Sequence, residues 1–346
     1  MKTIGVIGHF GFGKNLLDGQ TIKTKIVTSE LVKQVGSKQI KKVDTHGGLK
    51  TYIKLPVFIL QLLIKCKNIA IFPAQNGVLY IIPLLVTLNV FFRRGLHYIV
   101  IGGWLPELVA KKPILKYFLK CFDGIYVETS TMKLALSKIG LNNVWIMKNC
   151  KNLKILEKEE LQTPLSEPLK LCIFSRIMRE KGIEDAIDAV RTINENERRQ
   201  VYQLDIYGQI DQNQTDWFEL LRQQFPPYIF YRGFVPYTEG SQVLKNYFAL
   251  LFPTRFYTEG IPGTIVDSYA AGVPVICSKW ENYLDVVDDN STGCCYPFGK
   301  VAQLISLLDS IWKNPSKINA MKTACIRKAH EYLPYNNVKV LVDHLR

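Results

Sequence analysis

The sequence predicts an α/β protein of two doubly wound domains, each with a parallel sheet covered by helices. Three observations support this prediction. The chain has 346 residues, enough for two cores of ordinary size. Hydrophobic residues make up 47% of it and charged residues 21%, which is a globular composition. Short apolar runs alternate with longer helix-like segments along the whole chain, as in repeated strand–helix units.

The first half contains four runs typical of buried strands, separated by helical patterns. The expected strands are Thr3–Ile7, Ile69–Phe72, Tyr98–Ile101 and Gly124–Val127. The expected helices are Thr21–Val35, Val57–Cys66, Val78–Arg93 and Met132–Ile139.

The second half repeats this pattern. Its expected strands are Lys170–Ser175, Val201–Tyr207, Ile229–Gly233, Ala249–Phe252 and Val273–Cys277. Its expected helices are Ile183–Asn194, Trp217–Gln224 and Ala302–Lys313. The Glu-rich segment Leu153–Pro168, with two prolines, is the best linker candidate, so we expect domains at 1–153 and 154–334.

The net charge of +14 is concentrated in the first half. Residues 1–153 contain 22 Lys and Arg against 6 Asp and Glu, whereas the remainder contains 22 against 24. This asymmetry favours an anionic partner surface, either nucleic acid or the anionic inner leaflet of a membrane, although a well-solvated basic surface is the alternative. Nucleic acid is not expected, because the sequence has no zinc-finger spacing, RNP motif or KH glycine loop.

Membrane and metal signals are limited. The apolar segment 78–92, followed by Arg93 and Arg94, is shorter than the ~20 residues of a spanning helix. It predicts a buried core helix, with partial membrane insertion as the alternative. The eight cysteines form no CxxC pair, and the five histidines form no HxxxH or HExxH spacing. With too short an apolar run for a signal peptide, the chain is expected to be cytoplasmic, peripheral at most to the inner membrane face, and free of metal.

The most informative segment runs from Glu259 to Ile276 and reads EGIPGTIVDSYAAGVPVI. Pro262 suits a first helical turn and Gly272 a helix end, so the segment predicts a loop, a short helix and a buried strand. Glu259 then precedes the helix, and Asp267 lies about two turns into it. The helix amides would face an anion and the carboxylates would bond hydroxyls, which suits a polyhydroxylated anionic ligand.

This segment resembles the acid-x7-acid motif of retaining, nucleotide-sugar-dependent glycosyltransferases, the bacterial group that builds capsule and lipopolysaccharide. The resemblance implies the GT-B fold, in which two Rossmann-like domains face one another across a cleft and a C-terminal helix, here 335–346, packs back on the first domain. It implies that Glu259 contacts the donor sugar and that Asp267, where the family usually has Glu, binds the ribose. The neighbouring donor-binding residues would be Gly260, Ile261, Pro262, Gly263 and Thr264.

A second motif, LCIFSRIMREKG, covers Leu171 to Gly182 and reads as a strand, a basic loop and a helix start. Arg176 and Lys181 follow the carboxyl end of the strand, where a planar fork and a mobile point charge suit a diphosphate. The segment resembles the family's SRxxxEKG motif, whose Arg and Lys clamp the donor diphosphate. An ordinary exposed basic turn is the alternative.

Other matches to the family are weaker. Gly19, at a helix start, is the closest match to the family's glycine-containing loop that reaches towards donor or acceptor, and Gly208 fits a strand end that usually carries glycine. Plain structural roles are the alternatives for both. The family commonly places a histidine after the fourth strand of the first domain. Here Gly102 and Gly103 occupy that place, and His97 lies at the opposite end of the strand.

Together these motifs predict a glycosyltransferase that moves a sugar from a nucleotide-diphosphate sugar to a saccharide or lipid-linked acceptor, with retention, in cell-surface polysaccharide synthesis. The resemblance implies that the departing phosphate accepts the acceptor's proton and that no metal or other cofactor is required. Two alternatives stay open. A sugar-nucleotide epimerase on the same fold would need acid and base groups around the sugar, and a non-catalytic binding subunit would fit the missing histidine.

Overall fold

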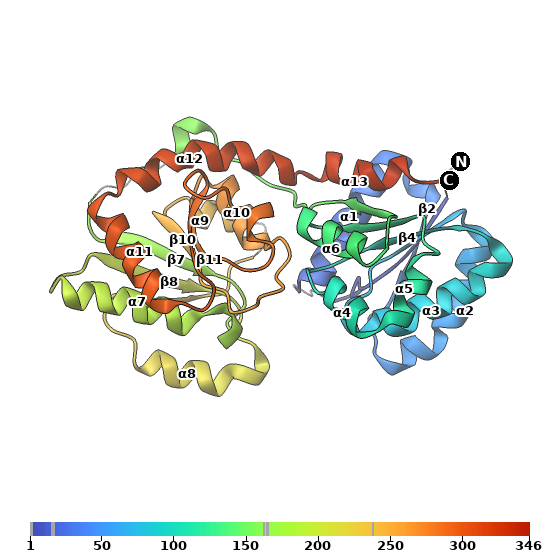
Figure 1. The fold of residues 1–346 in the computed structure, drawn as a ribbon, viewed down its shortest axis with the longest axis horizontal. Helices are drawn as coiled ribbons and strands as arrows, with labels where there is room; N and C mark the ends of the chain where they lie inside the picture. Colours follow the sequence, from blue (N-terminus) through green and yellow to red (C-terminus); the bar gives the residue numbers. More distant parts are fainter. Residues whose placement is uncertain (1–2, 15–17, 162, 164–165, 237–238) are drawn as a thin grey trace. The chain divides into compact units, whose positions relative to one another are not determined.

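The computed structural model describes residues 3–14, 18–161, 163, 166–236 and 239–346, and the chain divides into two compact units. The first unit comprises Met1–Asn152 and Tyr332–Arg346, and the second comprises Leu153–Glu331. Each unit contains a six-stranded sheet in which all paired strands are parallel, with helices around it (Figure 1). The predicted fold class, two doubly wound α/β domains, is confirmed.

In the first unit the strand order is β2-β1-β3-β4-β5-β6. The strands are β1 (Ile4–Gly8), β2 (Ile40–Asp44), β3 (Asn68–Ile71), β4 (Gly95–Ile99), β5 (Gly124–Val127) and β6 (Val144–Ile146). The helices are α1 (Gly19–Val35), α2 (Leu49–Lys65), α3 (Gln75–Phe92), α4 (Leu105–Lys111), α5 (Pro113–Leu119), α6 (Ser130–Lys138) and α13 (Pro334–Asp343).

The two faces of this sheet have separate cores. Helices α1 and α13 pack together, and their apolar residues join a cluster that includes Val27 and Leu341. Helices α2, α3 and α5 contribute instead to a cluster that includes Leu62 and Leu85. The reversal of direction after β2 explains this division, because right-handed crossovers in opposite directions place their helices on opposite faces.

In the second unit the strand order is β12-β11-β10-β7-β8-β9. The strands are β7 (Leu169–Phe174), β8 (Tyr202–Tyr207), β9 (Ile229–Gly233), β10 (Ala249–Phe252), β11 (Val275–Ser278) and β12 (Gly293–Tyr296). The helices are α7 (Ile183–Asn196), α8 (Thr215–Gln223), α9 (Gly240–Leu244), α10 (Gly263–Ala270), α11 (Val301–Lys313) and α12 (Ser316–Ala329).

Some elements differ from the sequence-based expectation. Strand β2 was not predicted, because its sequence IKKVD lacks a continuous apolar run, and it lies at the edge of the sheet where its two lysines are exposed. Helix α2 begins at Leu49 and not at Val57, since it continues through Pro56. A proline in a helix interior removes one backbone donor and usually predicts a boundary. Strands β6 and β12 are only three and four residues long and were also missed.

Candidate functional site

The second sheet changes winding direction between β7 and β10, which are hydrogen-bonded neighbours far apart in the chain. In open parallel sheets, ligands bind outside the carboxyl ends of the strands at such a switch point. The loop after β7 carries Arg176 and Lys181, and the loop after β10 carries Glu259. The topology therefore brings the two sequence motifs to one edge of the sheet.

Lys181 and Glu259 form an ion pair across these two loops. Each side chain retains 18% of its exposure, so the pair is partly shielded but open to a ligand. The Lys181 ammonium also lies 5.9 Å from the ring centre of Phe252 and 5.5 Å from that of Phe256. Aromatic faces attract a cation, so Lys181 is held between an acid and two rings.

The backbone around this pair is tightly packed. Gly182 has a φ of +71°, and a Cβ there would lie 1.9 Å from the carbonyl oxygen of Pro253, so only glycine fits. The amide of Arg255 donates to the carbonyl of Glu180 at 2.8 Å, and the side-chain amide of Asn282 donates to the carbonyl of Glu259 at 2.7 Å. These contacts fix the two loops against each other and thereby position Lys181 and Glu259.

Arg176 lies in the same loop but is half exposed, and its guanidinium is 3.4 Å from the carboxylate of Asp211. The loop is braced by the segment after β8, where Gln214 accepts a bond from the amide of Arg179 at 2.7 Å. Gln214 also donates to Glu180 at 3.0 Å, and this hydrogen bond lowers the pKa of Glu180. The guanidinium of Arg176 is therefore accessible to a ligand, while hydrogen bonds hold its loop in place.

Gly208 follows β8 with a φ of +146°, and a Cβ there would lie 1.7 Å from the carbonyl oxygen of Ser175. Packing between the ends of β7 and β8 is thus a sufficient reason for this glycine. Its predicted contact with the donor stays a prediction, and so does the donor contact of Gly19, which begins α1 in the first unit.

The segment Gly260–Thr264 leads into α10, whose N-cap is Pro262. No side chain among the described residues caps this helix, so its first-turn amides can face an anion. The hydroxyl of Thr264 is buried and has no hydrogen-bond partner among the described residues, so it is available to bond to a ligand. Gly260 and Ile261 are buried beside it.

Asp267 lies in the second turn of α10 and is 5% exposed. A Cβ at Gly240, the first residue of α9, would lie 3.1 Å from its carboxylate, so the acid faces the start of α9. The structure thus brings Lys181 and Glu259 into contact, whereas Asp267 is directed at a different element.

The first unit contains a polar cluster that the sequence analysis missed. His9 follows β1, and its ring nitrogens lie 2.7 Å from the hydroxyl of Thr21 and 3.0 Å from His46. Asp18 caps α1 and accepts from the hydroxyl of Thr21 at 2.7 Å, and these bonds lower its pKa although burial opposes them. Because β2 was not predicted, the proximity of His46 to His9 could not be inferred from the sequence.

His97 has a structural environment. It is fully buried in β4, 3.1 Å from the hydroxyl of Tyr126 and 3.2 Å from the side-chain oxygen of Asn68. Burial lowers the pKa of His97 to about 4, so the ring is neutral at neutral pH. At the other end of the strand, where the family has its histidine, the ammonium of Lys23 lies 2.5 Å from Glu128 and 2.8 Å from the carbonyl of Val100.

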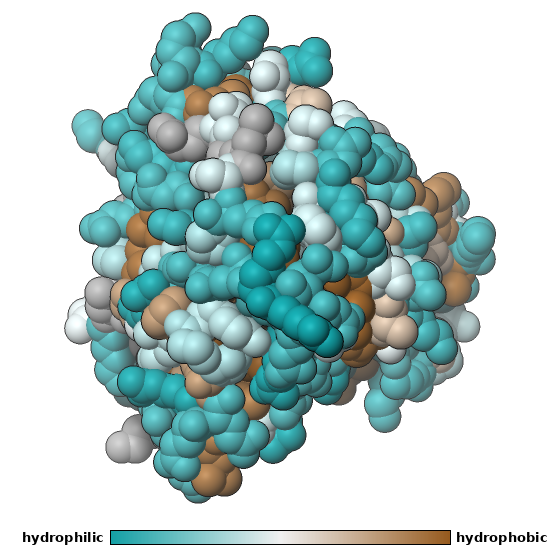
Figure 2. Space-filling view, turned by 90° about the vertical axis from the view of Figure 1, so that its left-hand side faces the viewer, coloured by the Kyte–Doolittle hydropathy of each residue, from teal (hydrophilic) through white to brown (hydrophobic). Residues whose placement is uncertain are grey.

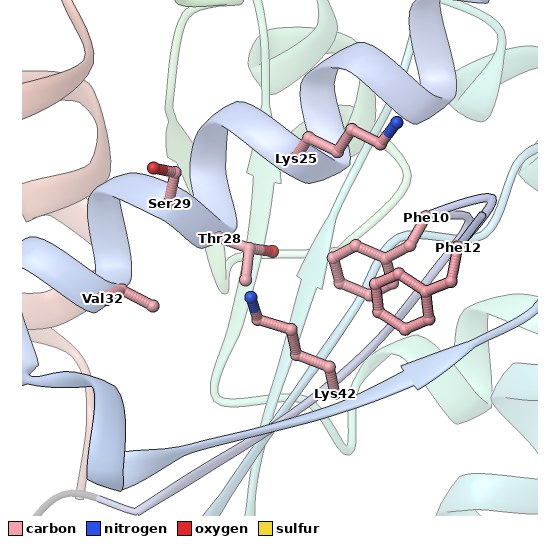
Figure 3. Close-up of a pocket in the computed structure, with 7 residues that line it drawn as sticks. All are labelled: Phe10, Phe12, Lys25, Thr28, Ser29, Val32 and Lys42. Carbon is pink, nitrogen blue, oxygen red and sulfur yellow. The ribbon is translucent and has the colours of Figure 1, made fainter. Parts of the chain in front are cut away.

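A shallow pocket of about 330 Å³ also lies in the first unit, between α1 and β2 (Figure 3). The rings of Phe10 and Phe12 stack with their centres 5.0 Å apart, and the Lys42 side chain extends towards Thr28. Lys25 lines the same pocket. The Thr28 hydroxyl is buried without a hydrogen-bond partner among the described residues. The pocket therefore combines an aromatic surface, two cations and a free hydroxyl.

The described residues contain no group of three or more His, Cys, Asp or Glu side chains that could hold a metal ion.

Residues 157–330 match the family described as Glycosyl transferases group 1. A curated relative, the amylovoran biosynthesis glycosyltransferase AmsK of Erwinia amylovora, is 21% identical over 257 residues. That match covers 69% of the chain but only 58% of the relative.

Solved structures resemble the chain over nearly its whole length. HepE of Anabaena, in a complex with UDP, aligns with a TM-score of 0.76 and 14% identity over 99% of this chain and 98% of HepE. Sucrose-phosphate synthase of Thermosynechococcus elongatus aligns with a TM-score of 0.75 and 15% identity over 99% of this chain and 98% of the synthase. At such identities, these matches establish the fold alone.

Proposed function

The chain belongs to the glycosyl transferases group 1 family, and we propose that it moves a sugar from a nucleotide-diphosphate sugar to a saccharide or lipid-linked acceptor, with retention, in cell-surface polysaccharide synthesis. The observation that carries this proposal is the ion pair between Lys181 and Glu259 at the switch point of the second sheet. In this proposal Lys181 binds the diphosphate and Glu259, which is in contact with it, binds the sugar. Two of the similar proteins, an amylovoran biosynthesis glycosyltransferase and a protein solved in complex with UDP, support this proposal.

The donor diphosphate would bind between Lys181, Arg176 and the first-turn amides of α10. Lys181 then exchanges its contact with Glu259 for a contact with phosphate, and the freed carboxylate accepts hydrogen bonds from sugar hydroxyls. Preorganised cations and amides stabilise the charge that grows on the leaving group, which is the main electrostatic demand of the reaction. Asp267 would bind the ribose, close to the start of α9.

The proposed transfer breaks the bond between the anomeric carbon and the phosphate oxygen, and the electron pair leaves with the nucleoside diphosphate. The acceptor oxygen attacks the same face of the sugar, and its proton passes to the departing phosphate oxygen. In this proposal Glu259 orients the sugar through hydrogen bonds to its hydroxyls and is not the group that receives the acceptor's proton. The cations supply the charge neutralisation that a metal ion would otherwise give.

The acceptor would bind on the first unit, where the pocket between α1 and β2 suits a saccharide. The stacked rings of Phe10 and Phe12 can support the apolar face of a sugar ring, and the Thr28 hydroxyl can bond to it. Neither Lys25 nor Lys42 forms an ion pair with a described residue, so both can bind an acidic group on that saccharide.

Nucleotide release from a panel of nucleotide sugars tests this proposal. The purified protein should hydrolyse or transfer one donor sugar selectively, and a saccharide or lipid-linked acceptor should accelerate nucleotide release. Glu259→Gln should abolish the release, whereas Glu219→Gln on α8, a half-exposed acid that pairs with Arg222 on the same helix, should not. Retention is checked by the anomeric configuration of the product. A protein that binds no nucleotide and releases none from any donor contradicts the proposal.

A further inference from the structure

Helix α2 is apolar on both its inner and its outer side. Its inner side packs into the core through Leu55, Ile59, Leu62 and Leu63. Its outer side carries four exposed apolar residues at helical spacing, Ile53, Val57, Leu60 and Ile64, of which Ile53 is 69% exposed. A helix of a soluble domain normally presents polar residues to water, so this outer stripe lacks an explanation within the unit.

Helix α3 packs beside α2 (Figure 1). Val90 and Phe91 are exposed near its C-terminal end, and Phe91 retains 84% of its exposure. Both helices connect parallel strands of one sheet, so they run in the same direction and their C-terminal ends lie together. We name the six residues Ile53, Val57, Leu60, Ile64, Val90 and Phe91 the outer apolar face. The side of the second unit that faces the viewer in Figure 2 is, by contrast, largely hydrophilic with scattered apolar residues.

The charged residues of the two helices that carry the outer apolar face are all basic. No Asp or Glu occurs between Asp44 and Glu107, a stretch that includes α2 and α3 completely. Lys54 and Lys65 are exposed on α2, and the exposed Arg93 ends α3. Exposed apolar side chains on a helix, accompanied only by basic residues, are typical of surfaces that enter the interfacial region of an anionic bilayer.

We propose that the outer apolar face docks on an anionic lipid bilayer, with its apolar side chains at the acyl boundary and its lysines and Arg93 among the headgroups. A second copy of the chain is a poor occupant, because a symmetric interface would bring like charges together. This docking goes beyond the proposed transfer and does not depend on the nucleotide site. It would hold the protein at the inner membrane face, where a lipid-linked acceptor is presented.

The fold favours docking over spanning. Helix α3 is, by length and composition, the one helix among the described residues that could cross a membrane. Its inner side, however, packs on the core, and the strands before and after it, β3 and β4, are hydrogen-bonded neighbours. A spanning α3 would have to separate β3 and β4 to opposite sides of the bilayer and break the sheet between them.

Co-sedimentation of the purified full chain with vesicles tests the proposal. We expect binding to vesicles of phosphatidylcholine mixed with phosphatidylglycerol, weak binding to phosphatidylcholine alone, and release at high salt. Lys54→Gln with Lys65→Gln should weaken binding at low salt by about fivefold per lysine. Ile64→Ser with Phe91→Ser should weaken it by about tenfold or more, because both side chains lose their apolar contact with the acyl boundary.

Two matched controls lie away from this face. Leu220→Ser changes a similarly exposed leucine on α8, and Lys339→Gln changes an exposed lysine on α13, which packs with α1 on the opposite face of the first sheet. Both should bind vesicles as the wild type does. Nucleotide binding should persist in all variants, so a failure of docking is distinguishable from a failure of the donor site.

Three results would overturn the proposal. The first is equal, negligible binding to both vesicle types at low salt. The second is unchanged binding of both double variants. The third is a dimer in solution that Ile64→Ser with Phe91→Ser dissociates, which would assign the face to a second copy of the chain.

Discussion

The ion pair between Lys181 and Glu259 leads to opposite expectations for two substitutions that each remove one of its charges. Lys181→Met removes the cation that we assign to the diphosphate, and the loss of one charge-assisted hydrogen bond costs roughly 1.5–3 kcal/mol. Nucleotide affinity should therefore fall by roughly 10- to 100-fold. Glu259→Gln removes the acid that competes with phosphate for Lys181, so nucleotide affinity should stay intact or increase.

The size of that increase follows from the exposure of the pair. Each side chain is 18% exposed, so the pair is partly shielded from water. We therefore assign it an interaction free energy of about 1 kcal/mol, the upper end of the range for solvent-accessible ion pairs. Release of Lys181 from Glu259 can thus tighten nucleotide binding by at most about fivefold. Transfer should nevertheless be nearly lost in Glu259→Gln, because the amide no longer orients the sugar as a carboxylate does.

Calorimetry with UDP, or with GDP or ADP if the wild type binds those instead, measures both variants and the double variant. In the double variant, the gain from Glu259→Gln should vanish, since no Lys181 is left to be released. Lys317→Met, an exposed lysine on α12, is a matched control and should leave the affinity unchanged. Unchanged affinity in Lys181→Met, or wild-type transfer in Glu259→Gln, would refute the assignment of this pair to the donor.

Four further predictions follow from the geometry. Arg176→Ala should weaken nucleotide binding and slow transfer, and calorimetry showing neither effect would remove Arg176 from the diphosphate site. Activity should persist in EDTA, and complete loss with recovery on adding magnesium or manganese would contradict a cationic clamp that works without metal. The pKa of His97 falls from 6.5 to about 4 on burial, so the unfolded chain binds a proton that the native state does not. Stability should therefore fall as pH drops from 6.5 to about 4, by up to about 3 kcal/mol, and His97→Gln should flatten this dependence in urea titrations. Gly208→Ala should lower the thermal midpoint and nucleotide affinity together, because a Cβ would displace Ser175, the neighbour of Arg176.

The fold class could be predicted from the sequence because the patterns that indicate it lie within single strands and helices and recur along the chain. Buried parallel strands such as β5 and β10 are continuous apolar runs, and helices such as α7 have strong amphipathic patterns. The motif with Arg176 and Lys181 and the motif with Glu259 each follow a strand. Once the strand order places β7 beside β10, both motifs must therefore lie at the same edge of the sheet. Edge strand β2 has neither an apolar run nor clear alternation, and without it the approach of His46 to His9 could not be predicted.

The outer side of α2 shows a second limit of sequence reasoning. Residues 57–66 are almost uniformly apolar, so periodicity could not distinguish the side that faces the core from the side that faces water. Only the fold assigns Leu62 to the core and Ile64 to the surface. The sequence-based interpretation linked membrane affinity to the basic first half and to the apolar residues 78–92 with Arg93 and Arg94, whereas the exposed apolar stripe with the most regular spacing lies on the preceding helix.

The glycines show why a motif match alone cannot assign a ligand contact. Gly182 and Gly208 both belong to segments that resemble donor-binding motifs, and both are required by backbone packing, since a Cβ would meet a carbonyl oxygen at 1.9 or 1.7 Å. A Cβ at Gly19, by contrast, would meet no atom of the described residues within 4 Å, so packing against those residues does not explain this glycine. A side chain there would meet none of the described residues, so a substitution tests the predicted ligand contact without disturbing their packing. The weaker sequence match is therefore the more informative position: a change at Gly19 that impairs transfer can be attributed to the ligand, whereas a change at Gly208 also disturbs the fold.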